Sequence, residues 1–490
     1  MPEESVENTP VNKGSLADAP APADLLCRFQ RQQARRQAVR FGNASERIAK
    51  LRRLKAAILA HRDQLVAAMT QEFHKPRMEV ELSEVQLVLT ELGHTIRHLR
   101  TWMRPARVPT PIHLLGTRSE IRCEPRGLVL ILAAWNYPFA LLFAPLVAAI
   151  AAGNCVMLRG SERVPLTNAV AERILSECFD PDEVSMVRGD LSVAASLVEL
   201  PFDHIFFTGT AEVARRIMAA SAPRLTSLTL ELGGKSPVIV DESADIATAA
   251  ERITWGKFFN AGQTCVAPDY VLVHAARADE LCASMRSVIK RFYGENDSAR
   301  RGSSDLCRII DERNFNKLRS LLEDAVGHGA RVEIGGHVDA DERYIAPTVL
   351  SCVPADCAIM QEEIFGPILP VLAYQHLDEA IKFVNGQPKP LALYVFSRRG
   401  EQAERILRLT SAGGTVINNV VLHLLNPDLP FGGVGMSGMG SYHGRFGFRA
   451  FSHERAIMMQ GRFNPASWFY PPYARLYNGV RGWLARHLGA

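Results

Sequence analysis

From residue 127 to residue 158 the chain carries no charged side chain, and this run decides between two very different folds. It is long enough to cross a membrane. The run is broken, however, by Asn-Tyr-Pro at 136–138 and again by Pro145. We therefore expect a buried strand over 128–134, a loop, and a buried helix that ends near Gly153, as in the interior of an α/β protein.

The same alternation of strand and helix continues downstream. Short apolar runs at 155–158, 184–187 and 204–207 are separated by helical segments, and residues 25–103 upstream read as helices, with Ser45 as a plausible cap. This βαβα order predicts a parallel sheet with ligands at the carboxyl ends of its strands. A second set of strands is expected after residue 231, at 238–240, 270–273 and 415–417.

A reactive thiol is the main candidate for chemistry. Cys265 lies in FFNAGQTCVAPDY, where small and polar neighbours let the backbone turn and leave room beside the sulfur. Shortly upstream, TLELGGKSP offers the carboxylate of Glu231 before two glycines. A thiol that attacks a carbonyl and then releases an acyl group by hydrolysis needs such a base nearby. A single cysteine in a polar loop is more often unreactive, and the pairing with Glu231 raises the odds.

These motifs together carry a family resemblance. ELGGKSP followed by NAGQTC, then MQEEIFGPILP and LPFGGVGMSGMGSYHGRFGF, resembles the aldehyde dehydrogenase superfamily, and its class 3 branch with the fatty and coniferyl aldehyde enzymes in particular. The resemblance covers roughly residues 25–459. It implies an α/β fold with a Rossmann-like parallel-sheet cofactor domain, an α/β catalytic domain and a small bridging or oligomerisation element.

The resemblance also implies domain boundaries. The NAD(P)-binding domain is expected over 24–105 and 126–230, the catalytic domain over 231–418, and the bridging element over 106–125 and 419–460. Residues 1–23 read as a disordered tail. Residues 461–490 read as a tail with a possible amphipathic helix, which packs on the protein or lies on a membrane surface but is too short and too charged to span.

Cofactor contacts follow residue by residue from the family motifs. After the 204–207 strand, TGTAEVARR places Thr208, Gly209, Thr210 and Ala214 toward the cofactor pyrophosphate, with Ala214 where relatives have glycine. After the 155–158 strand, Arg159 and Glu162 take the place of a lysine and a glutamate that reach the adenosine ribose. In MQEEIFGPILP, Glu363 is expected to hold the nicotinamide ribose and Phe365 to pack beside the nicotinamide ring.

The preferred dinucleotide follows from charge. Glu162 would repel a ribose 2′-phosphate, which favours NAD, whereas Arg159 favours NADP, so NAD is expected and NADP remains the alternative.

The expected reaction is the NAD(P)-dependent oxidation of an aldehyde to its acid. Cys265 adds to the aldehyde, the Asn136 amide and the Cys265 N–H stabilise the oxyanion, and Glu231 activates water against the thioester. Apolar residues after Asn136 (Tyr137, Phe139, Leu141 and Leu142) suggest a hydrophobic or aromatic aldehyde. Lys235 is expected to order its loop. The alternatives are a coenzyme A-acylating relative and an inactive, membrane-docking binding protein on the same scaffold.

Composition sets the remaining expectations. A net charge of +4 on 490 residues gives no reason to expect nucleic acid as a partner. The nine cysteines have no zinc-type spacing, Cys352 and Cys357 coming closest, so no metal is expected and a reducing, cytoplasmic location is favoured. Class 3 relatives are commonly dimers, which implies a homodimer.

Overall fold

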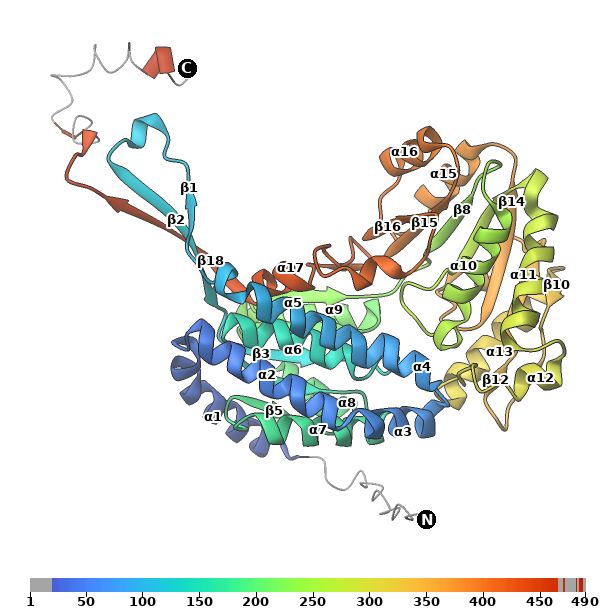
Figure 1. Ribbon diagram of the computed structural model, residues 1–490, viewed down its shortest axis with the longest axis horizontal. Coiled ribbons are helices and arrows are strands. Elements are labelled where there is room, and N and C mark those ends of the chain that lie inside the picture. Colours follow the sequence, from blue (N-terminus) through green and yellow to red (C-terminus); the bar gives the residue numbers. More distant parts are fainter. Residues whose placement is uncertain (1–19, 466–469, 472–481, 483, 488–490) are drawn as a thin grey trace, which may run out of the picture.

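The computed structural model describes residues 20–465, 470–471, 482 and 484–487 (Figure 1). Two α/β bodies, each built on its own sheet, lie side by side, and a narrow group of strands projects from one of them. The chain has the mixed α/β architecture with parallel sheets that the alternating pattern predicts.

The first body contains a six-stranded sheet in the order β17-β7-β6-β3-β4-β5. All neighbours in it are parallel except β17, which runs antiparallel to β7. The chain moves outward from β3 in both directions, so the carboxyl ends of β3 and β6 flank a switch point where ligands bind in such sheets. The strands are β3 (Leu128–Leu132), β4 (Cys155–Arg159), β5 (Val184–Met186), β6 (His204–Thr208), β7 (Ser227–Glu231) and β17 (Gly438–Met439).

Both faces of this sheet are covered by helices, which explains why its strands are apolar throughout. Val129 and Ile131 of β3 join one hydrophobic core, and the alternating Leu128, Leu130 and Leu132 join another. The helices of this body are α1 (Pro22–Arg40), α2 (Ala44–Ala60), α3 (Arg62–Phe73), α4 (Arg77–Val80), the π-helix η2 (Glu81–Val85), α5 (Gln86–Trp102), α6 (Ala140–Ala152), α7 (Pro165–Cys178), α8 (Leu191–Val198), α9 (Ala211–Ser221) and α17 (Gly444–Ala450).

The second body contains a seven-stranded sheet in the order β10-β13-β14-β9-β8-β15-β16. Only β10 is antiparallel to its neighbour. The strands are β8 (Pro237–Val240), β9 (Tyr270–His274), β10 (Arg331–Ile334), β13 (Thr348–Ser351), β14 (Ile368–Tyr374), β15 (Ala392–Phe396) and β16 (Gly414–Ile417). The helices around it include α10 (Ile246–Phe258), α11 (Ala278–Tyr293), α12 (Asp297–Arg301), α13 (Glu312–Gly327), α14 (Ala358–Gln361), α15 (Leu377–Asn385) and α16 (Gly400–Leu409), and β11 (Val338–Asp339) pairs with β12 (Tyr344–Ile345).

The projecting strands form a three-stranded antiparallel sheet that stands clear of both bodies in Figure 1. It consists of β1 (Ala106–Val108), β2 (Thr117–Pro125) and β18 (Ser452–Gln460). Strands β2 and β18 pair along their whole length. Segments far apart in the sequence therefore meet in one extension.

The uncharged stretch is a strand, a loop and a helix, as predicted: β3 ends at Leu132 and α6, buried from Leu142 to Ala152, ends before Gly153. Among the described residues, no helix has the length and apolar character needed to cross a bilayer. The predicted cap Ser45 was wrong, because Asn43 caps α2 and Glu46 completes a capping box with it. Most of the predicted N-terminal tail and of the predicted C-terminal amphipathic helix lies outside the described residues.

Candidate active site

The Cys265 loop is a tightly wound segment between the 3-10 turn η5 (Phe259–Gly262) and β9. Asn260, Ala261 and Gly262 all have positive φ angles, of 53°, 51° and 73°. Two of these three residues are not glycine, and such strained backbone occurs mainly where function requires a particular geometry. A Cβ at Gly262 would lie 2.3 Å from the Gly366 carbonyl oxygen, so this loop touches the segment that carries Glu363 and Phe365.

A largely apolar cavity of about 320 Å³ opens onto the Cys265 loop. Cys265 is itself partly exposed and lines it, with Thr264 and Val266 on either side. Of the residues predicted to form an apolar substrate site, Tyr137 and Leu141 line this cavity. Phe139 and Leu142 do not: both are fully buried in the core, where Phe139 stacks on Phe143. The remaining apolar lining includes Leu82, Leu87, Trp255, Phe259, Val421, Leu422, Leu424, Leu425, Phe431 and Tyr442.

Glu231 ends β7 and is 3% exposed. Neither oxygen of its carboxylate has a hydrogen-bond partner among the described residues, and burial raises its pKa well above the ordinary value. Burial and, after it, the carboxylates of Glu363 and Glu231 together raise the pKa of the Cys265 thiol to about 12. The main-chain N–H groups of Cys265 and Val266 point to the sulfur and act in the opposite direction. The Cys265 thiol and these two acidic groups therefore affect one another electrostatically.

Asn136 follows β3 and is brought to the same loop. Its side-chain Nδ2 donates to the Gln263 carbonyl oxygen at 3.1 Å, two residues before Cys265. The next residue, Tyr137, places its hydroxyl 2.6 Å from the Thr264 hydroxyl. An amide nitrogen carries two protons, so one N–H of Asn136 remains for another acceptor.

An ion pair that the sequence analysis did not predict holds the segment that carries Glu363. The Lys235 ammonium lies 2.5 Å from the Asp269 carboxylate and also donates to the carbonyls of Ile359 and Glu362. Asp269 accepts the Ile364 N–H at 3.0 Å. Lys235 was predicted to order its loop; the loop that these contacts hold is the one with Glu363, whose pKa burial and Asp269 raise to about 7.

Phe365 meets Trp135 edge-on, with ring centroids 5.6 Å apart. Its φ of 54° marks a second strained position. Trp135 directly precedes Asn136, so the ring contact ties the Asn136 loop to the Glu363 segment.

Apart from Glu363 and Phe365, the residues predicted to hold the cofactor lie at or follow the carboxyl ends of β4 and β6. Arg159 and Glu162 form an ion pair at 2.5 Å, and Arg159 also donates to the Gly189 carbonyl. The buried hydroxyl of Thr208 has no hydrogen-bond partner among the described residues, and Thr208 pairs with Glu231 in the sheet. This edge, with an orphaned hydroxyl and a carboxylate near each other, fits a dinucleotide.

Gly209 and the start of α9 complete this edge. A Cβ at Gly209 would lie 2.4 Å from the Phe207 ring, which explains the glycine, and Thr210 caps α9 by accepting the Val213 N–H. Ala214, by contrast, is 2% exposed and belongs to the core beneath α9. The methyl group that distinguishes it from glycine is therefore in contact with other apolar side chains.

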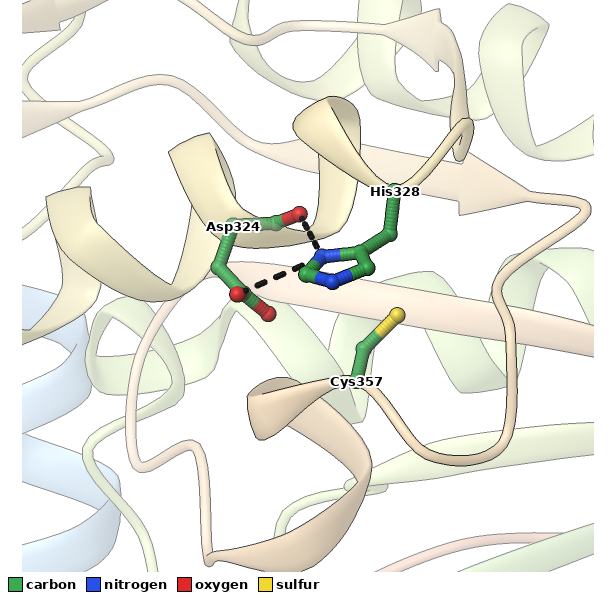
Figure 2. A group of neighbouring side chains, drawn as sticks. All are labelled: Asp324, His328 and Cys357. Atoms are coloured by element: carbon green, nitrogen blue, oxygen red, sulfur yellow. Dashed lines mark hydrogen bonds and ion pairs between the residues drawn. The ribbon is translucent and has the colours of Figure 1, made fainter.

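One group of possible metal ligands occurs among the described residues: Asp324, His328 and Cys357, whose ligand atoms all lie within 4.8 Å (Figure 2). Asp324 already accepts the Ala358 N–H at 3.0 Å, and the His328 Nδ1 lies 2.8 Å from the Asp324 carbonyl. These contacts join the end of α13 to the start of α14.

Comparison with known proteins agrees with this geometry. The family model described as "Aldehyde dehydrogenase family" matches residues 9–457. The 4,4'-diaponeurosporen-aldehyde dehydrogenase of Staphylococcus aureus is 43% identical over 434 residues, which cover 89% of this chain and 93% of that protein. Aldehyde dehydrogenase family 3 member B1 of Rattus norvegicus is 44% identical, and the match covers 89% of this chain and 92% of that protein. A probable coniferyl aldehyde dehydrogenase of Pseudomonas aeruginosa is 39% identical, and the match covers 91% of this chain and 93% of that protein.

Solved structures of aldehyde dehydrogenases also resemble this chain. The substrate-bound state of Staphylococcus aureus AldH matches with a TM-score of 0.90 and 41% identity, covering 94% of this chain and 99% of that one. A Mycobacterium tuberculosis aldehyde dehydrogenase complexed with NAD+ matches with a TM-score of 0.82 and 25% identity, covering 91% and 92%. With a family model spanning most of its length and relatives near 40% identity over nine-tenths of it, this chain belongs to the aldehyde dehydrogenase family.

Proposed function

We propose that this enzyme oxidises a hydrophobic aldehyde to its carboxylic acid, with Cys265 as nucleophile, Asn136 as oxyanion donor and Glu231 as the base for hydrolysis. The observation that carries the proposal is the partly exposed residue Cys265 on an apolar cavity, together with a buried Glu231 carboxyl that acts electrostatically on the thiol and has no partner among the described residues. A buried acidic group without a hydrogen-bond partner is rare in proteins and is typical of a functional site.

The chain's own groups account for the acyl-transfer steps. The sulfur of Cys265, as the thiolate, bonds to the aldehyde carbon while the C=O π bond opens, and the carbonyl oxygen becomes an oxyanion that accepts from the free N–H of Asn136 and from the Cys265 N–H. When bound, NAD+ supplies the hydride acceptor and a positively charged ring that favours the Cys265 thiolate. Loss of the aldehyde hydrogen as hydride leaves the acyl group on the Cys265 sulfur as a thioester. Glu231 then takes a proton from water, which attacks the thioester carbon; the C–S bond breaks, the acid is released and the thiolate is reprotonated.

The cofactor is proposed to be NAD+ with NADP+ as the weaker alternative. Arg159 and Glu162 pair with each other, so the positive charge of Arg159 is already neutralised and a 2′-phosphate would face the Glu162 carboxylate. Thr208, Gly209 and Thr210 would receive the pyrophosphate side, and Glu363 and Phe365 the nicotinamide ribose and ring. Ala214 supports this edge from within the core.

A hydrophobic substrate is supported by the lining of the cavity, in which apolar residues from η2, α5, α10 and the 3-10 turn η7 (Leu422–Leu425) predominate.

A cytoplasmic location is supported by the cysteines, all nine of which lie within the described residues and are free. A homodimer is supported by the projecting sheet, because β1 is exposed along its length and Ile112, Leu115 and Met458 are exposed beside it. Light scattering tests the dimer.

The test is NADH formation, followed by absorbance, with a long-chain or cinnamyl-type aldehyde. We expect turnover without coenzyme A, and none with Cys265→Ala. Turnover that requires coenzyme A would favour the acylating alternative, for which Glu231 has no necessary role. An unchanged rate in Cys265→Ala would remove the cysteine from the mechanism, and a wild-type protein that binds NAD+ but turns over no aldehyde would favour the inactive alternative.

A further inference from the structure

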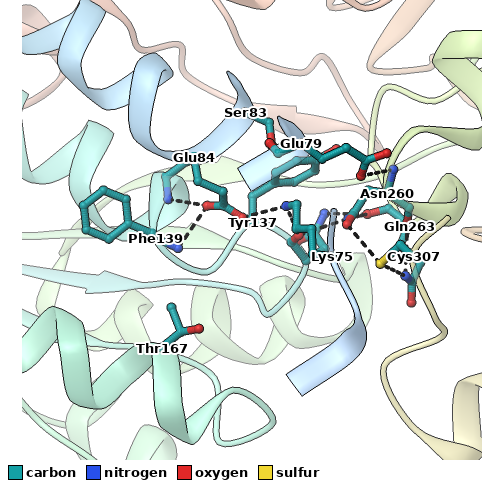
Figure 3. Close-up of polar contacts among 12 residues, drawn as sticks. Lys75, Glu79, Ser83, Glu84, Tyr137, Phe139, Thr167, Asn260, Gln263 and Cys307 are labelled. Carbon is teal, nitrogen blue, oxygen red and sulfur yellow. Dashed lines mark hydrogen bonds and ion pairs between the residues drawn. The ribbon is translucent and has the colours of Figure 1, made fainter. Parts of the chain in front are cut away.

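A fully buried ion pair lies behind the active site and has no part in the mechanism above. Lys75 and Glu84 are both 0% exposed, and the Lys75 ammonium lies 2.7 Å from the Glu84 carboxylate (Figure 3). Both belong to the segment from 75 to 84, which follows α3 and contains α4 and most of η2. Placing two charges in a protein interior costs free energy that their attraction only partly offsets, so stability alone is a poor reason for such a pair.

The two members of the pair contact different parts of the loop that carries Asn136. The Lys75 ammonium reaches the Asn136 carbonyl oxygen at 3.4 Å and lies over the Tyr137 ring, 4.0 Å from its centroid. The second oxygen of Glu84 accepts the N–H groups of Phe139 and Ala140 at 3.2 and 2.9 Å. These N–H groups begin α6, which has no cap from its own chain neighbours, so Glu84 caps it from another element.

A second acid of the same segment holds the Cys265 loop. Glu79 accepts the N–H of Asn260 at 2.9 Å, at a residue whose left-handed backbone needs support. The Asn260 side chain in turn donates to the Asn136 carbonyl at 3.0 Å and to the Gln263 carbonyl at 3.1 Å. The Asn136 amide donates to that same Gln263 carbonyl. The two catalytic loops are thus held together by groups that come from one segment.

We propose that the 75–84 segment positions the oxyanion donor: Lys75, paired with Glu84, and Glu79, acting through Asn260, fix the main chain of Asn136 so that its amide faces the carbonyl oxygen of the aldehyde that Cys265 attacks. This inference rests on the proposed function and adds three positioning residues to it. They touch no reacting atom and act only through Asn136 and the loop before Cys265.

The π-helix at 81–85 connects this role to the substrate cavity. Leu82 and Ser83 line the cavity, whereas Glu84 points away from it to α6. A π-turn widens the spacing of side chains around a helix and is frequent at functional sites. In this protein it allows adjacent residues to serve the substrate wall and the Asn136 loop.

The test is a double-mutant cycle with Asn136→Ala. The variant Lys75→Met/Glu84→Gln removes both charges together, so that neither is left unpaired, and the new amide side chain retains an oxygen for the α6 N–H groups. We expect kcat to fall about tenfold in the wild-type background and less than twofold in Asn136→Ala, with the KM for NAD+ unchanged in both. A residue that acts through Asn136 has little left to affect once that amide is gone.

Equal loss of kcat in both backgrounds, or no loss in the wild-type background, would overturn the proposal. A matched control is Lys50→Met/Glu183→Gln, which removes another largely buried ion pair between α2 and the start of β5. Its unfolding midpoint should change while kcat stays constant. The Cys265→Ala result is independent of this cycle, so failure of the proposed function and failure of this inference are distinguishable.

A second pair of variants tests the Glu79 arm even if the first variant does not fold. Glu79→Gln keeps an oxygen for the Asn260 N–H, whereas Glu79→Leu removes it. We expect kcat within twofold of wild type in Glu79→Gln and at least fivefold lower in Glu79→Leu. Equal rates in these two variants would contradict a positioning role for Glu79.

Discussion

The ammonium of Lys235 lies 2.5 Å from the carboxylate of Asp269, and both groups are nearly buried. Lys235 follows the strand that ends in Glu231, Asp269 follows the Cys265 loop, and both also contact the segment that carries Glu363. One ion pair therefore connects the strand of the proposed base, the loop of the proposed nucleophile and the segment of a predicted cofactor contact.

Replacing Lys235 with methionine should leave the Asp269 charge buried without its partner. We expect the free energy of unfolding to fall by about 3 kcal/mol, because removing one member of a buried pair costs more than the pair itself contributes. The KM for NAD+ should rise several-fold as the Glu363 segment loosens. Urea unfolding and initial rates measure the two effects, and Arg216→Met, at an exposed pair on α9, is the control. A KM equal to that of wild type would show that the segment is held by other contacts.

The rate should rise with pH. Burial raises the pKa of both Glu231, the proposed base, and Cys265, the proposed nucleophile, so the deprotonated form of each increases toward higher pH than for the free side chain. In single-turnover measurements from pH 6 to 10, the rate of acid release should increase in wild type and become flat and slow in Glu231→Gln. A rate that falls over this range would contradict the assignment of Glu231.

Stability should show the opposite pH dependence. A carboxyl whose folded pKa is raised holds its proton more tightly when folded, so the folded state loses stability as pH rises from the unfolded pKa, about 4.3, toward the folded pKa. Above the unfolded value, Glu231→Gln should therefore be more stable than wild type by a margin that grows with pH. Urea midpoints at pH 5, 7 and 9 measure this margin, and a constant difference would argue against a raised Glu231 pKa.

Glu162→Gln should weaken the preference for NAD+. Removing the carboxylate removes the repulsion of a 2′-phosphate and frees Arg159 to meet it, so the ratio of kcat/KM for NAD+ to that for NADP+ should fall about tenfold, or about 1.4 kcal/mol. Glu172→Gln, which removes the partner of Arg188 on α7, is the control. A ratio within twofold of wild type would place the selectivity elsewhere.

Longer aldehydes should be better substrates. Each methylene buried in the apolar cavity contributes about 0.8 kcal/mol, so kcat/KM should rise about fourfold per CH₂ along the n-alkanals until the cavity is filled. Leu425→Ser, at an exposed lining residue, should reduce this gain for the longer members and leave acetaldehyde unaffected. Best turnover on acetaldehyde would contradict a hydrophobic substrate site.

The sequence was most informative where the local pattern determines the structure. The uncharged run at 127–158 predicted β3 and α6, because strands buried on both faces are apolar throughout.

Contacts between distant segments were beyond the reach of sequence patterns. Nothing in the sequence distinguishes Lys75 and Glu84 from surface charges on a helix, yet folding buries both against the Asn136 loop. Phe139 and Leu141 looked equivalent, and the start of α6 directs only Leu141 to the cavity. The cap of α2 was misassigned by two residues because Asn43 and Ser45 both suit that position.

The most direct test of the account is the mass of the protein after one turnover in Glu231→Gln. Without the base the thioester should accumulate, so incubation with NAD+ and a long-chain aldehyde should add the mass of the aldehyde less two hydrogens, on the peptide that contains Cys265. The double variant Glu231→Gln/Cys265→Ala should gain no mass. NADH formation in Glu231→Gln with no acyl group on Cys265, or with the group on another residue, would contradict the mechanism.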